Sequence, residues 1–486
     1  MRIVALSSPV KSAYYGQDKR EATHTIQQYA LSKDIFRVSN KMLLHVPDSN
    51  VYEYKKLTIH LDNGVVHECK ENEWIQLILT MEKKNTETTT TTTTDKEMIS
   101  SVMQKHSRTV PMTYLQDRMD FKVHISPERR PTCNILMPGL SIHLTGGPWS
   151  IFEIAQKMME KGIRVRIINV APSKYKWSDV IPLLPYSQQG EWVDYENVNH
   201  ITYSSSDVFM ATLYWTAFLA HSMQQKLNQK SILYMIQDCE SFFFPQNSES
   251  AYAYASYEIP HIPIFNSWVL EEYFQQNHMS VFGGTFQEPS FQFFPTYPST
   301  AHRQKMEKGK KRLIVYSRPQ TDRNAYDFTM SCVWEAVRQG LFPPEKWMIF
   351  GVGATAGTPN ISGLGGGDVK MYNMDHMDQD KYKELITTGD IGLSLMLTPH
   401  PSLPPFDFAA AGMLVVTNEL FHRTKNTYKS ISQNFFPARL SILSIVESLR
   451  KALTKVDDYD FRIQGSFLNI PPHVIDYDYL KKHMEL

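Results

Sequence analysis

Residues 390–419 form the stretch that most constrains how this chain folds. They read DIGLSLMLTPHPSLPPFDFAAAGMLVVTNE, which predicts a buried strand over 391–396, a Pro-rich loop, a helix that begins near Pro405 and ends at Gly412, and a second buried strand over 413–417. Two apolar strands joined by a helix are typical of a parallel sheet whose faces are both covered. The stretch therefore predicts an α/β fold.

The Pro-rich loop of this unit is the first candidate site. Open α/β sheets bind ligands where a strand ends and a helix begins, and the N–H groups and partial positive charge of a helix N-terminus suit a phosphate. Pro404 and Pro405 open this helix, and Asp407 lies in its first turn, where its carboxylate is placed to accept hydrogen bonds from a hydroxyl pair such as a ribose. On spacing alone, the simpler interpretation is the better one, namely that Asp407 only stabilises the helix dipole.

Two arginines follow another predicted strand, over 313–316, in the segment SRPQTDRNAYDF. Arg318 lies just past the strand, and Arg323 lies five residues further on, before a predicted helix over 325–340. Two guanidiniums on one loop can bind a diphosphate bidentately. Surface ion pairing is the alternative, and the residues alone give it equal weight.

A glycine pair marks a similar loop earlier in the chain. A short strand over 134–137, a loop that ends in Gly146 and Gly147, a helix up to Gly162 and a strand over 163–170 form a strand–loop–helix–strand unit. Because glycine has no side chain, a phosphate or a sugar can approach the backbone of this loop. By itself the pair is a weak signal, since most such pairs are turns.

Three further predicted strands end in polar or aromatic residues, and they cover 207–213, 231–237 and 261–266. In a parallel sheet these ends lie along one edge and face one cleft. Trp215 is placed to stack on the apolar face of a sugar, and Asp238 and Glu240 are placed to bind sugar hydroxyls or to accept a proton. The alternatives are core packing for Trp215 and a helix N-cap for Asp238, and each has at least equal weight.

The chain has 486 residues, which is too long for a single core and suggests several domains. We predict an accessory region over 1–130, a first α/β domain over 131–300 and a second over 301–486. The passage 295–309 replaces apolar periodicity with prolines and charges, as expected at a domain boundary.

The accessory region gives few signals. Its segment 51–69 alternates weakly, with Asn63 and Gly64 as the turn between two strands of a hairpin. The run 86–94 is almost all threonine and predicts a flexible linker, because such a composition cannot bury a core.

Composition excludes several classes of function. The 50 basic residues equal the 50 acidic ones, so no global positive field indicates nucleic-acid binding. The four cysteines are scattered, which argues against a zinc site or a disulfide framework and fits a reducing compartment, and none of the three Asp-x-Asp pairs follows a buried strand. The longest apolar run, 208–220, is too short to span a bilayer. We therefore predict a cytoplasmic protein without a metal site or a transmembrane segment, and contact with a membrane surface stays open.

Several segments resemble a known family. Asp407, followed by Gly412 and VVTN, resembles the donor-site motif of GT-B glycosyltransferases related to family 4, in which an acidic residue at this position, usually Glu, holds the nucleotide ribose. A second Glu, usual eight residues earlier, is replaced here by Pro399. The phrase TPHPSLPP, the segment RPQTDRN and the run MIQDCES are more specific and resemble rhamnosyltransferases of the WsaF type. The resemblance covers residues 134–452.

This resemblance implies a GT-B fold, in which two Rossmann-like domains face each other across a cleft and the C-terminal helix returns to the first domain. The acceptor is then expected mainly in the first domain and the nucleotide-sugar donor in the second. Gly146, Gly147 and Gly351 are expected beside the donor; Gly351 ends a predicted strand and opens GVGATAG, whose glycines mimic a dinucleotide fingerprint without the helix that it needs.

The implied reaction transfers L-rhamnose from a dTDP or UDP donor to a glycan hydroxyl, with retention and without a cofactor. Arg318 and Arg323 are then expected to take the place of a metal at the leaving diphosphate. Two alternatives remain: transfer of another sugar, such as glucose or mannose, and an inactive glycan-binding module. The second is favoured by Pro399 and by Asp407 in place of Glu.

Overall fold

The structure, a computed structural model, describes residues 121–486 apart from 143–145, 185–189, 307–308, 354–357, 375–376, 378 and 473, together with seven strands in the N-terminal part. The chain divides into two compact units, Met1–Ser107 and Arg108–Leu486.

The N-terminal unit contains two small sheets. One has the strand order β1-β7-β4 and the other β3-β2-β5-β6. The strands are β1 (Arg2–Leu6), β2 (Val10–Tyr15), β3 (Arg20–Glu21), β4 (Ile35–Arg37), β5 (Lys56–Leu61), β6 (Val66–Lys70) and β7 (Trp74–Leu79). The hairpin predicted within 51–69 is confirmed, because β5 and β6 pair antiparallel with Lys56 opposite Lys70. Its predicted turn and the threonine run lie outside the described residues.

The first α/β domain is built on a seven-stranded parallel sheet of order β11-β10-β9-β13-β14-β15-β16. Its strands are β9 (Cys133–Met137), β10 (Val165–Asn169), β11 (Glu191–Val193), β13 (Val208–Ala211), β14 (Ile232–Ile236), β15 (His261–Phe265) and β16 (Phe291–Gln292). Every residue of β9, β10, β13, β14 and β15 is buried, as expected for apolar strands covered on both faces. All five strands predicted from the sequence of this domain are present.

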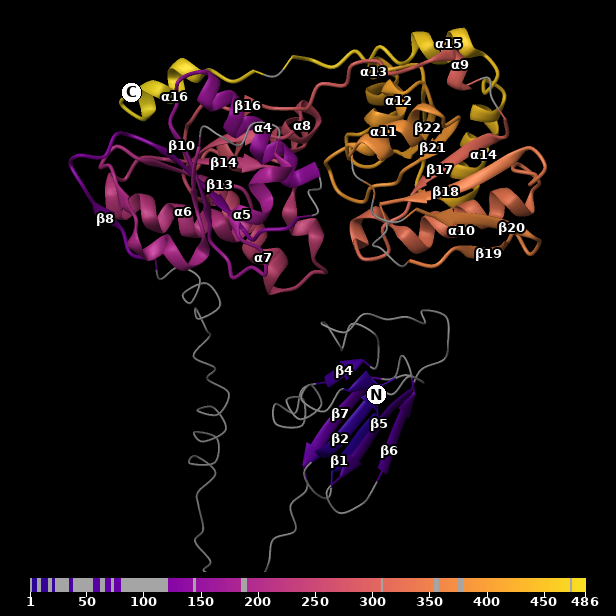
Figure 1. Ribbon diagram of the computed structural model, residues 1–486, viewed down its shortest axis with the longest axis horizontal. Coiled ribbons are helices and arrows are strands. Elements are labelled where there is room, and N and C mark those ends of the chain that lie inside the picture. The colour runs from indigo at the N-terminus through magenta and orange to yellow at the C-terminus, as the bar shows by residue number, and fades with distance from the viewer. Residues whose placement is uncertain are drawn as a thin grey trace, which may run out of the picture. The chain divides into compact units, whose positions relative to one another are not determined.

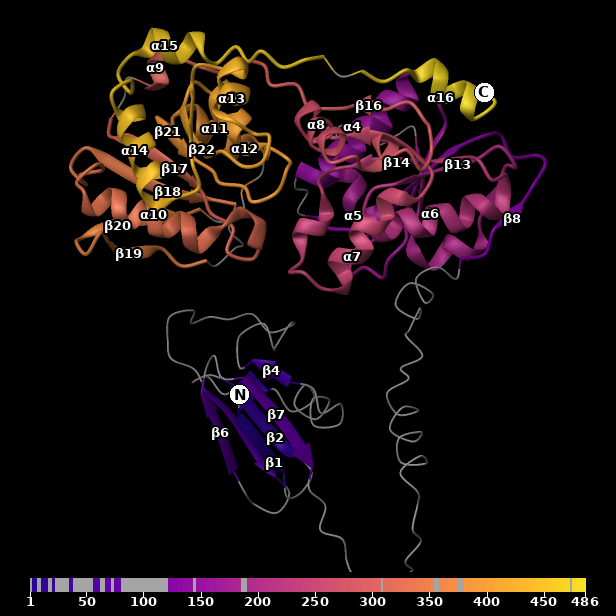
Figure 2. The same cartoon turned by 180° about the vertical axis from the view of Figure 1, so that it is seen from behind.

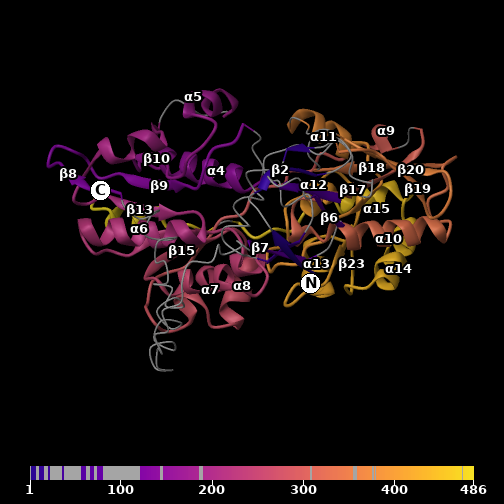
Figure 3. The same ribbon diagram turned by 90° about the horizontal axis from the view of Figure 1, so that it is seen from below.

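Helices cover both faces of this sheet. They are α4 (Gly146–Glu160), α5 (Trp177–Val180), α6 (Tyr214–Leu227), α7 (Ser248–Ala255) and α8 (Trp268–Gln276), and a short 3-10 helix, η4 (Glu240–Phe243), follows β14. Separate apolar clusters lie under α4 and under α6, and Figure 3 shows these two helices on opposite sides of the strands.

The second domain has the sheet order β19-β20-β18-β17-β21-β22-β23. Its strands are β17 (Lys311–Tyr316), β18 (Trp347–Val352), β19 (Ile361–Leu364), β20 (Val369–Asn373), β21 (Ile391–Leu393), β22 (Leu414–Asn418) and β23 (Phe435–Ala438). Its helices are η7 (Asp322–Asn324), α9 (Arg303–Met306), α10 (Tyr326–Arg338), α11 (Gln379–Thr387), α12 (Pro404–Ala410), α13 (Lys425–Ile431), α14 (Ile442–Leu453) and α15 (Tyr459–Gln464). All strand pairs are parallel except β19 with β20, a hairpin that the glycine-rich segment 357–367 did not predict.

The strand predicted over 391–396 is shorter in the structure. The ladder of β21 ends at Leu393, and Met396 N instead donates to the side chain of Asn418 (2.8 Å). A side-chain amide thus replaces the neighbouring strand as hydrogen-bond partner, which frees the chain to turn into the Pro-rich loop.

The C-terminal helix α16 (Tyr477–His483) returns to the first domain, as the sequence predicted (Figures 1 and 2). Leu480 and Met484 are buried in the core beneath α4, and His483 O accepts from the Nζ of Lys230 (2.8 Å). Two segments therefore cross between the domains, one from β16 to α9 and one from α15 to α16. Two Rossmann-like domains connected in this way have the GT-B arrangement.

Candidate active site

Asp238, at the end of β14, connects the two domains. Its carboxylate is buried; Oδ1 accepts from Cys239 N (2.8 Å) and from His400 N (3.1 Å), and Oδ2 accepts from Thr398 Oγ1 (2.5 Å). Thr398 and His400 belong to the Pro-rich loop of the second domain. In the structure both oxygens bind this loop, and the hydrogen bond to Thr398 joins residues 160 positions apart, which no local pattern indicates. The predicted role of Asp238 as a sugar ligand or a proton acceptor stays a prediction.

His400 is held as a neutral ring. Its Nδ1 accepts from Ser402 N (3.1 Å), so the proton resides on Nε2, which donates to Asn266 O at the end of β15 (3.2 Å). Burial lowers the pKa of His400 to about 3. Ser402 has a φ of 64°, a strained value for a residue other than glycine. The Pro-rich phrase was singled out from the sequence, but no role was predicted for this histidine.

Arg423, which the sequence analysis missed, anchors the same loop. The side chain is fully buried. Its Nη2 donates to Met396 O (2.8 Å) and Thr398 O (3.0 Å), and its Nη1 donates to Tyr428 OH (2.7 Å). Charged donors on the carbonyls of Met396 and Thr398 fix the backbone that presents Thr398 to Asp238.

Arg323 reaches from the second domain to the first. Its guanidinium lies over the ring of Phe243 in η4, 4.3 Å from the ring centre. Burial is the largest cause that lowers the pKa of Arg323; the neighbouring positive charge of Arg318 lowers it further, whereas Asp238 and Glu240 raise it. The structure thus brings together four of the residues that the sequence selected.

The loop that carries both arginines is braced on each side. Arg318 Nη1 donates to Tyr316 OH (3.3 Å), and Arg323 O accepts from Leu397 N (2.8 Å) of the Pro-rich loop. Ala325, where the loop enters α10, has a left-handed backbone with φ 50° and ψ 47°. Such strain persists only where the surroundings hold it, and it often marks a functional loop.

Asp407 lies in the first turn of α12, as predicted. Tyr382 OH donates to its Oδ2 (3.2 Å), and burial raises the pKa of Asp407 to about 7. Tyr297, on the segment that crosses from β16, is half-buried, and its buried hydroxyl has no hydrogen-bond partner among the described residues. Burial raises the pKa of Tyr297, and the charge of Asp407 raises it further. Neither tyrosine was predicted.

One part of the expectation for α12 is wrong. Pro404 and Pro405 have no N–H group, and the next two amides, of Phe406 and Asp407, both donate to Leu403 O (2.9 and 3.2 Å). The first turn therefore offers no unpaired N–H group to a phosphate. Only the helix dipole and side chains remain available there.

The glycine pair lies directly beside this helix. A Cβ atom on Gly146 would meet Leu403 Cδ1 at 2.7 Å, and one on Gly147 would meet Gln237 Oε1 at 3.0 Å. The beginning of α4 thus approaches the beginning of α12 across the domain interface. Gln237, whose Nε2 donates to Thr212 O (3.0 Å), is a further polar residue at this point that the sequence analysis missed.

The other three predicted residues have clear structural roles. Glu240 Oε2 accepts from Tyr214 N at the start of α6 (2.6 Å), and burial raises the pKa of Glu240 to about 8. Trp215 is 6% exposed and packs in the core under α6. Gly351 lies within β18, where a Cβ atom would clash with the side chain of Asn373. Binding of acceptor or donor by these three residues stays a prediction.

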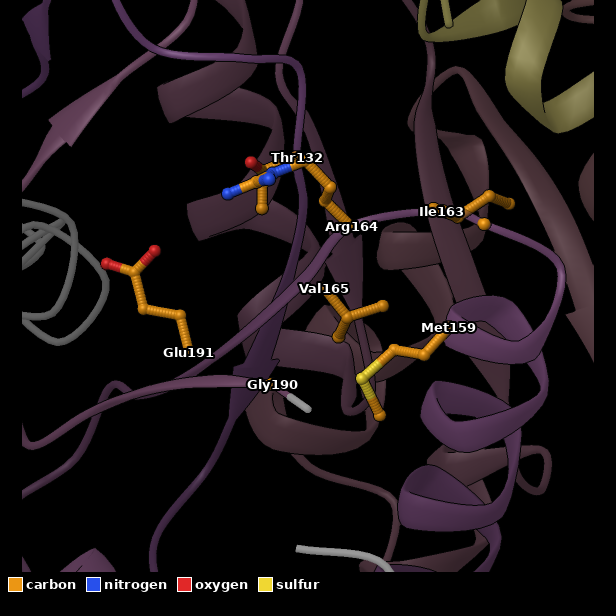
Figure 4. A pocket seen from close by; sticks show the side chains of 8 residues that line it. Thr132, Met159, Ile163, Arg164, Val165, Gly190 and Glu191 are labelled. Atoms are coloured by element: carbon orange, nitrogen blue, oxygen red, sulfur yellow. The ribbon is translucent and has the colours of Figure 1, made fainter. Parts of the chain in front are cut away.

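Other features lie away from this site. A cavity of about 520 Å³ opens at the opposite edge of the first sheet, between the start of β10 and β11, where Arg164 and Glu191 line it (Figure 4). Within the described part of the chain, no cluster of three His, Cys, Asp or Glu side chains is arranged to hold a metal ion, and no helix is long and apolar enough to cross a membrane.

Two family models match this chain, one in each α/β domain. The model of the WsaF N-terminal domain matches residues 132–268, and that of the WsaF C-terminal domain matches residues 311–450, together more than half of the chain. The O-antigen biosynthesis protein RfbC of Myxococcus xanthus is 25% identical over 284 residues, which span 57% of this chain but 21% of that protein.

Solved structures with a similar fold include a sucrose-phosphate synthase from Thermosynechococcus elongatus (TM-score 0.47, 10% identity, 70% of this chain and 95% of that one). Another is Anabaena HepE in complex with UDP-glucose (TM-score 0.49, 11% identity, covering 73% of this chain and 98% of that one).

Proposed function

Because the chain belongs to the WsaF family, we propose that it is a glycosyltransferase that transfers L-rhamnose from a dTDP or UDP donor to a glycan hydroxyl. One observation carries the proposal. Arg318 and Arg323 share a loop at the C-terminal end of β17, and this loop faces Asp238 and Glu240 of the first domain. A diphosphate between the domains would meet two fixed positive charges.

The arginines act on the leaving group. As the bond between the anomeric carbon and the diphosphate oxygen breaks, negative charge grows on the diphosphate, and Arg318 and Arg323 offset it where a metal ion would otherwise do so. A bond from the acceptor oxygen forms on the same face of the sugar, which retains the configuration. The acceptor proton passes to a diphosphate oxygen.

Other residues bind the donor and hold the two domains together. Asp407 accepts hydrogen bonds from the ribose hydroxyls of the donor, with Tyr382 holding its carboxylate in place. Asp238 draws the Pro-rich loop of the second domain against the first and thereby keeps water from the cleft. The likeness to an O-antigen biosynthesis protein supports a role in the synthesis of a bacterial-type polysaccharide.

The test is an assay of hydrolysis and transfer with a panel of nucleotide sugars (dTDP- and UDP-L-rhamnose, UDP-glucose and GDP-mannose), with and without excess chelator. We expect turnover with a rhamnose donor, unaffected by chelator, and a loss on the order of 10²–10³-fold in Arg318→Ala and Arg323→Ala. Arg323→Lys should keep part of the activity, because a point charge remains.

The matched control is Arg338→Ala, which removes an exposed arginine that pairs with Glu335 on α10. Its activity should equal that of the wild type. Turnover with glucose or mannose donors alone would overturn the rhamnose assignment. Activity abolished by chelator and restored by Mn²⁺, with both alanine variants near wild type, would overturn the mechanism. No turnover with any donor would favour the glycan-binding module.

A further inference from the structure

Three aromatic rings from both domains meet beside the candidate site, and two of them are exposed. Phe242 lies in η4, Tyr273 in α8 and Phe421 in a turn of the second domain; we call them the aromatic cluster. Ring centres are 5.2 Å apart for Phe242 and Phe421, 5.3 Å for Tyr273 and Phe421, and 6.2 Å for Phe242 and Tyr273. Although they touch, Phe242 is 38% and Phe421 is 48% exposed, whereas Tyr273 is buried. The rings thus form a partly open apolar surface.

The backbone of Phe421 is strained to keep its ring there. Leu420 and Arg423 exchange two backbone hydrogen bonds (3.1 and 2.9 Å), which leaves Phe421 and His422 at the tip of a two-residue turn. Phe421 has a φ of 52°, a region that bulky residues rarely adopt. The buried guanidinium of Arg423 fixes the turn. Burial of Phe421 offsets little of this strain, since the residue is 48% exposed.

A single short helix connects the aromatic cluster to the candidate active site. In η4, the side chain of Glu240 is buried, Phe243 lies under the guanidinium of Arg323, and Phe242 contacts Phe421. Any molecule that rests on the aromatic cluster is therefore within a few residues of the arginine that meets the diphosphate.

We propose that Phe242 and Phe421, which pack on the buried Tyr273, form a stacking platform for the acceptor glycan. The C–H face of a pyranose packs on aromatic rings, and rings held at fixed positions bind it with little loss of conformational freedom. This inference rests on the proposed function, because an acceptor glycan is needed only if sugar is transferred. The platform includes a ring from each domain, so it is complete only when the domains are closed, and acceptor binding and closure support each other.

The experiment uses the full-length protein and measures binding of methyl α-L-rhamnoside and of a rhamnose trisaccharide by calorimetry at saturating nucleotide. Phe421→Ala should weaken trisaccharide binding by about 2- to 10-fold, the range expected for one aromatic contact. Phe421→Leu keeps an apolar contact with Phe242 but offers no ring, and it should weaken binding as much as alanine does. Phe421→Trp keeps an aromatic ring at this position and should bind the trisaccharide about as tightly as the wild type does.

The matched control is Phe467→Ala, which removes a 69% exposed phenylalanine outside the aromatic cluster. Hydrolysis of the donor in water, which needs no acceptor, is measured in parallel to show that each variant still binds and cleaves the donor. If Phe421→Leu binds the trisaccharide like the wild type, the cluster is only a contact between the domains and the proposal fails. Lack of trisaccharide binding by the wild type, or equal affinity in Phe421→Ala, also overturns it. If the wild-type protein does not hydrolyse any donor, the proposed function itself is refuted.

Discussion

The hydrogen bond between Thr398 and Asp238 predicts the direction in which Thr398→Val changes the pKa of Asp238. Valine keeps the shape of the buried threonine but removes the hydroxyl that donates to Asp238 Oδ2 at 2.5 Å. A hydrogen bond to a charged group is worth about 1.5–3 kcal/mol, and one pH unit corresponds to about 1.4 kcal/mol. The pKa of Asp238, which burial raises to about 6 despite this hydrogen bond, should therefore rise further by about one to two pH units in the variant.

Activity and stability both report this change. If ionised Asp238 holds the loop, the acid limb of the pH profile of donor hydrolysis should move to higher pH by about one to two pH units. Because the pKa of Asp238 is higher in the folded protein than its ordinary value of 3.8, it contributes stability at pH values below 3.8. The wild type loses this contribution as pH rises through about 6, and the variant loses it at a higher pH. Denaturant unfolding should thus show a small difference from the wild type at pH 5 and a loss of about 1.5–3 kcal/mol at pH 8.

The control for this prediction is Thr417→Val, because the Thr417 hydroxyl is equally buried but has no hydrogen-bond partner within the part of the chain that the structure describes. It should leave the acid limb in place. An unchanged acid limb in Thr398→Val, together with the same stability loss at pH 5 and pH 8, would show that the hydroxyl does not act on an ionised Asp238.

Three further predictions concern other parts of the protein. Since burial raises the pKa of Asp407 to about 7, nucleotide affinity should increase as pH rises from 6 to 8, and Asp407→Asn should remove this dependence; a flat wild-type affinity in calorimetry would contradict ribose binding. Gly351→Ala should cost about 1–3 kcal/mol of unfolding free energy and much less in an Asn373→Ala background, whereas equal costs in thermal unfolding would exclude the clash. Leu480→Ala should cost about 2–5 kcal/mol in chemical denaturation, since Leu480 is 1% exposed; a negligible cost would mean that α16 is not part of the core.

The sequence predicted those parts of the structure that local patterns determine. Apolar runs bounded by glycine and proline located the central strands of both sheets, since a doubly covered parallel strand must be apolar along its length, but they did not locate β11, β16, β19, β20 or β23. The positions of Arg318, Arg323 and Asp407 were likewise predictable, because ligand loops follow strand ends. The last helix was predictable only through the family resemblance.

The connections among these residues were not predictable. Asp238 and Thr398 are 160 positions apart, so nothing in either segment indicates their hydrogen bond. Arg423 stands in a polar stretch without any motif, and its role depends on burial that only the fold creates. The two prolines of α12 were read as a helix start, which is right, but their missing N–H groups also removed the donors that a phosphate would need.

The two segments that cross between the domains run side by side, and they touch where the hydroxyls of Ser299 and Ser466 lie 2.6 Å apart. The first is also fastened to the second domain, because Thr300 N donates to Ala410 O (2.9 Å). In mechanical terms, two adjacent connecting segments allow one domain to rotate towards the other about the line of the segments and resist rotation about other axes. If the cleft shuts as proposed, these two segments would return Asp238 to the same two donors of the Pro-rich loop and so would restore the alignment of the two domains in each cycle.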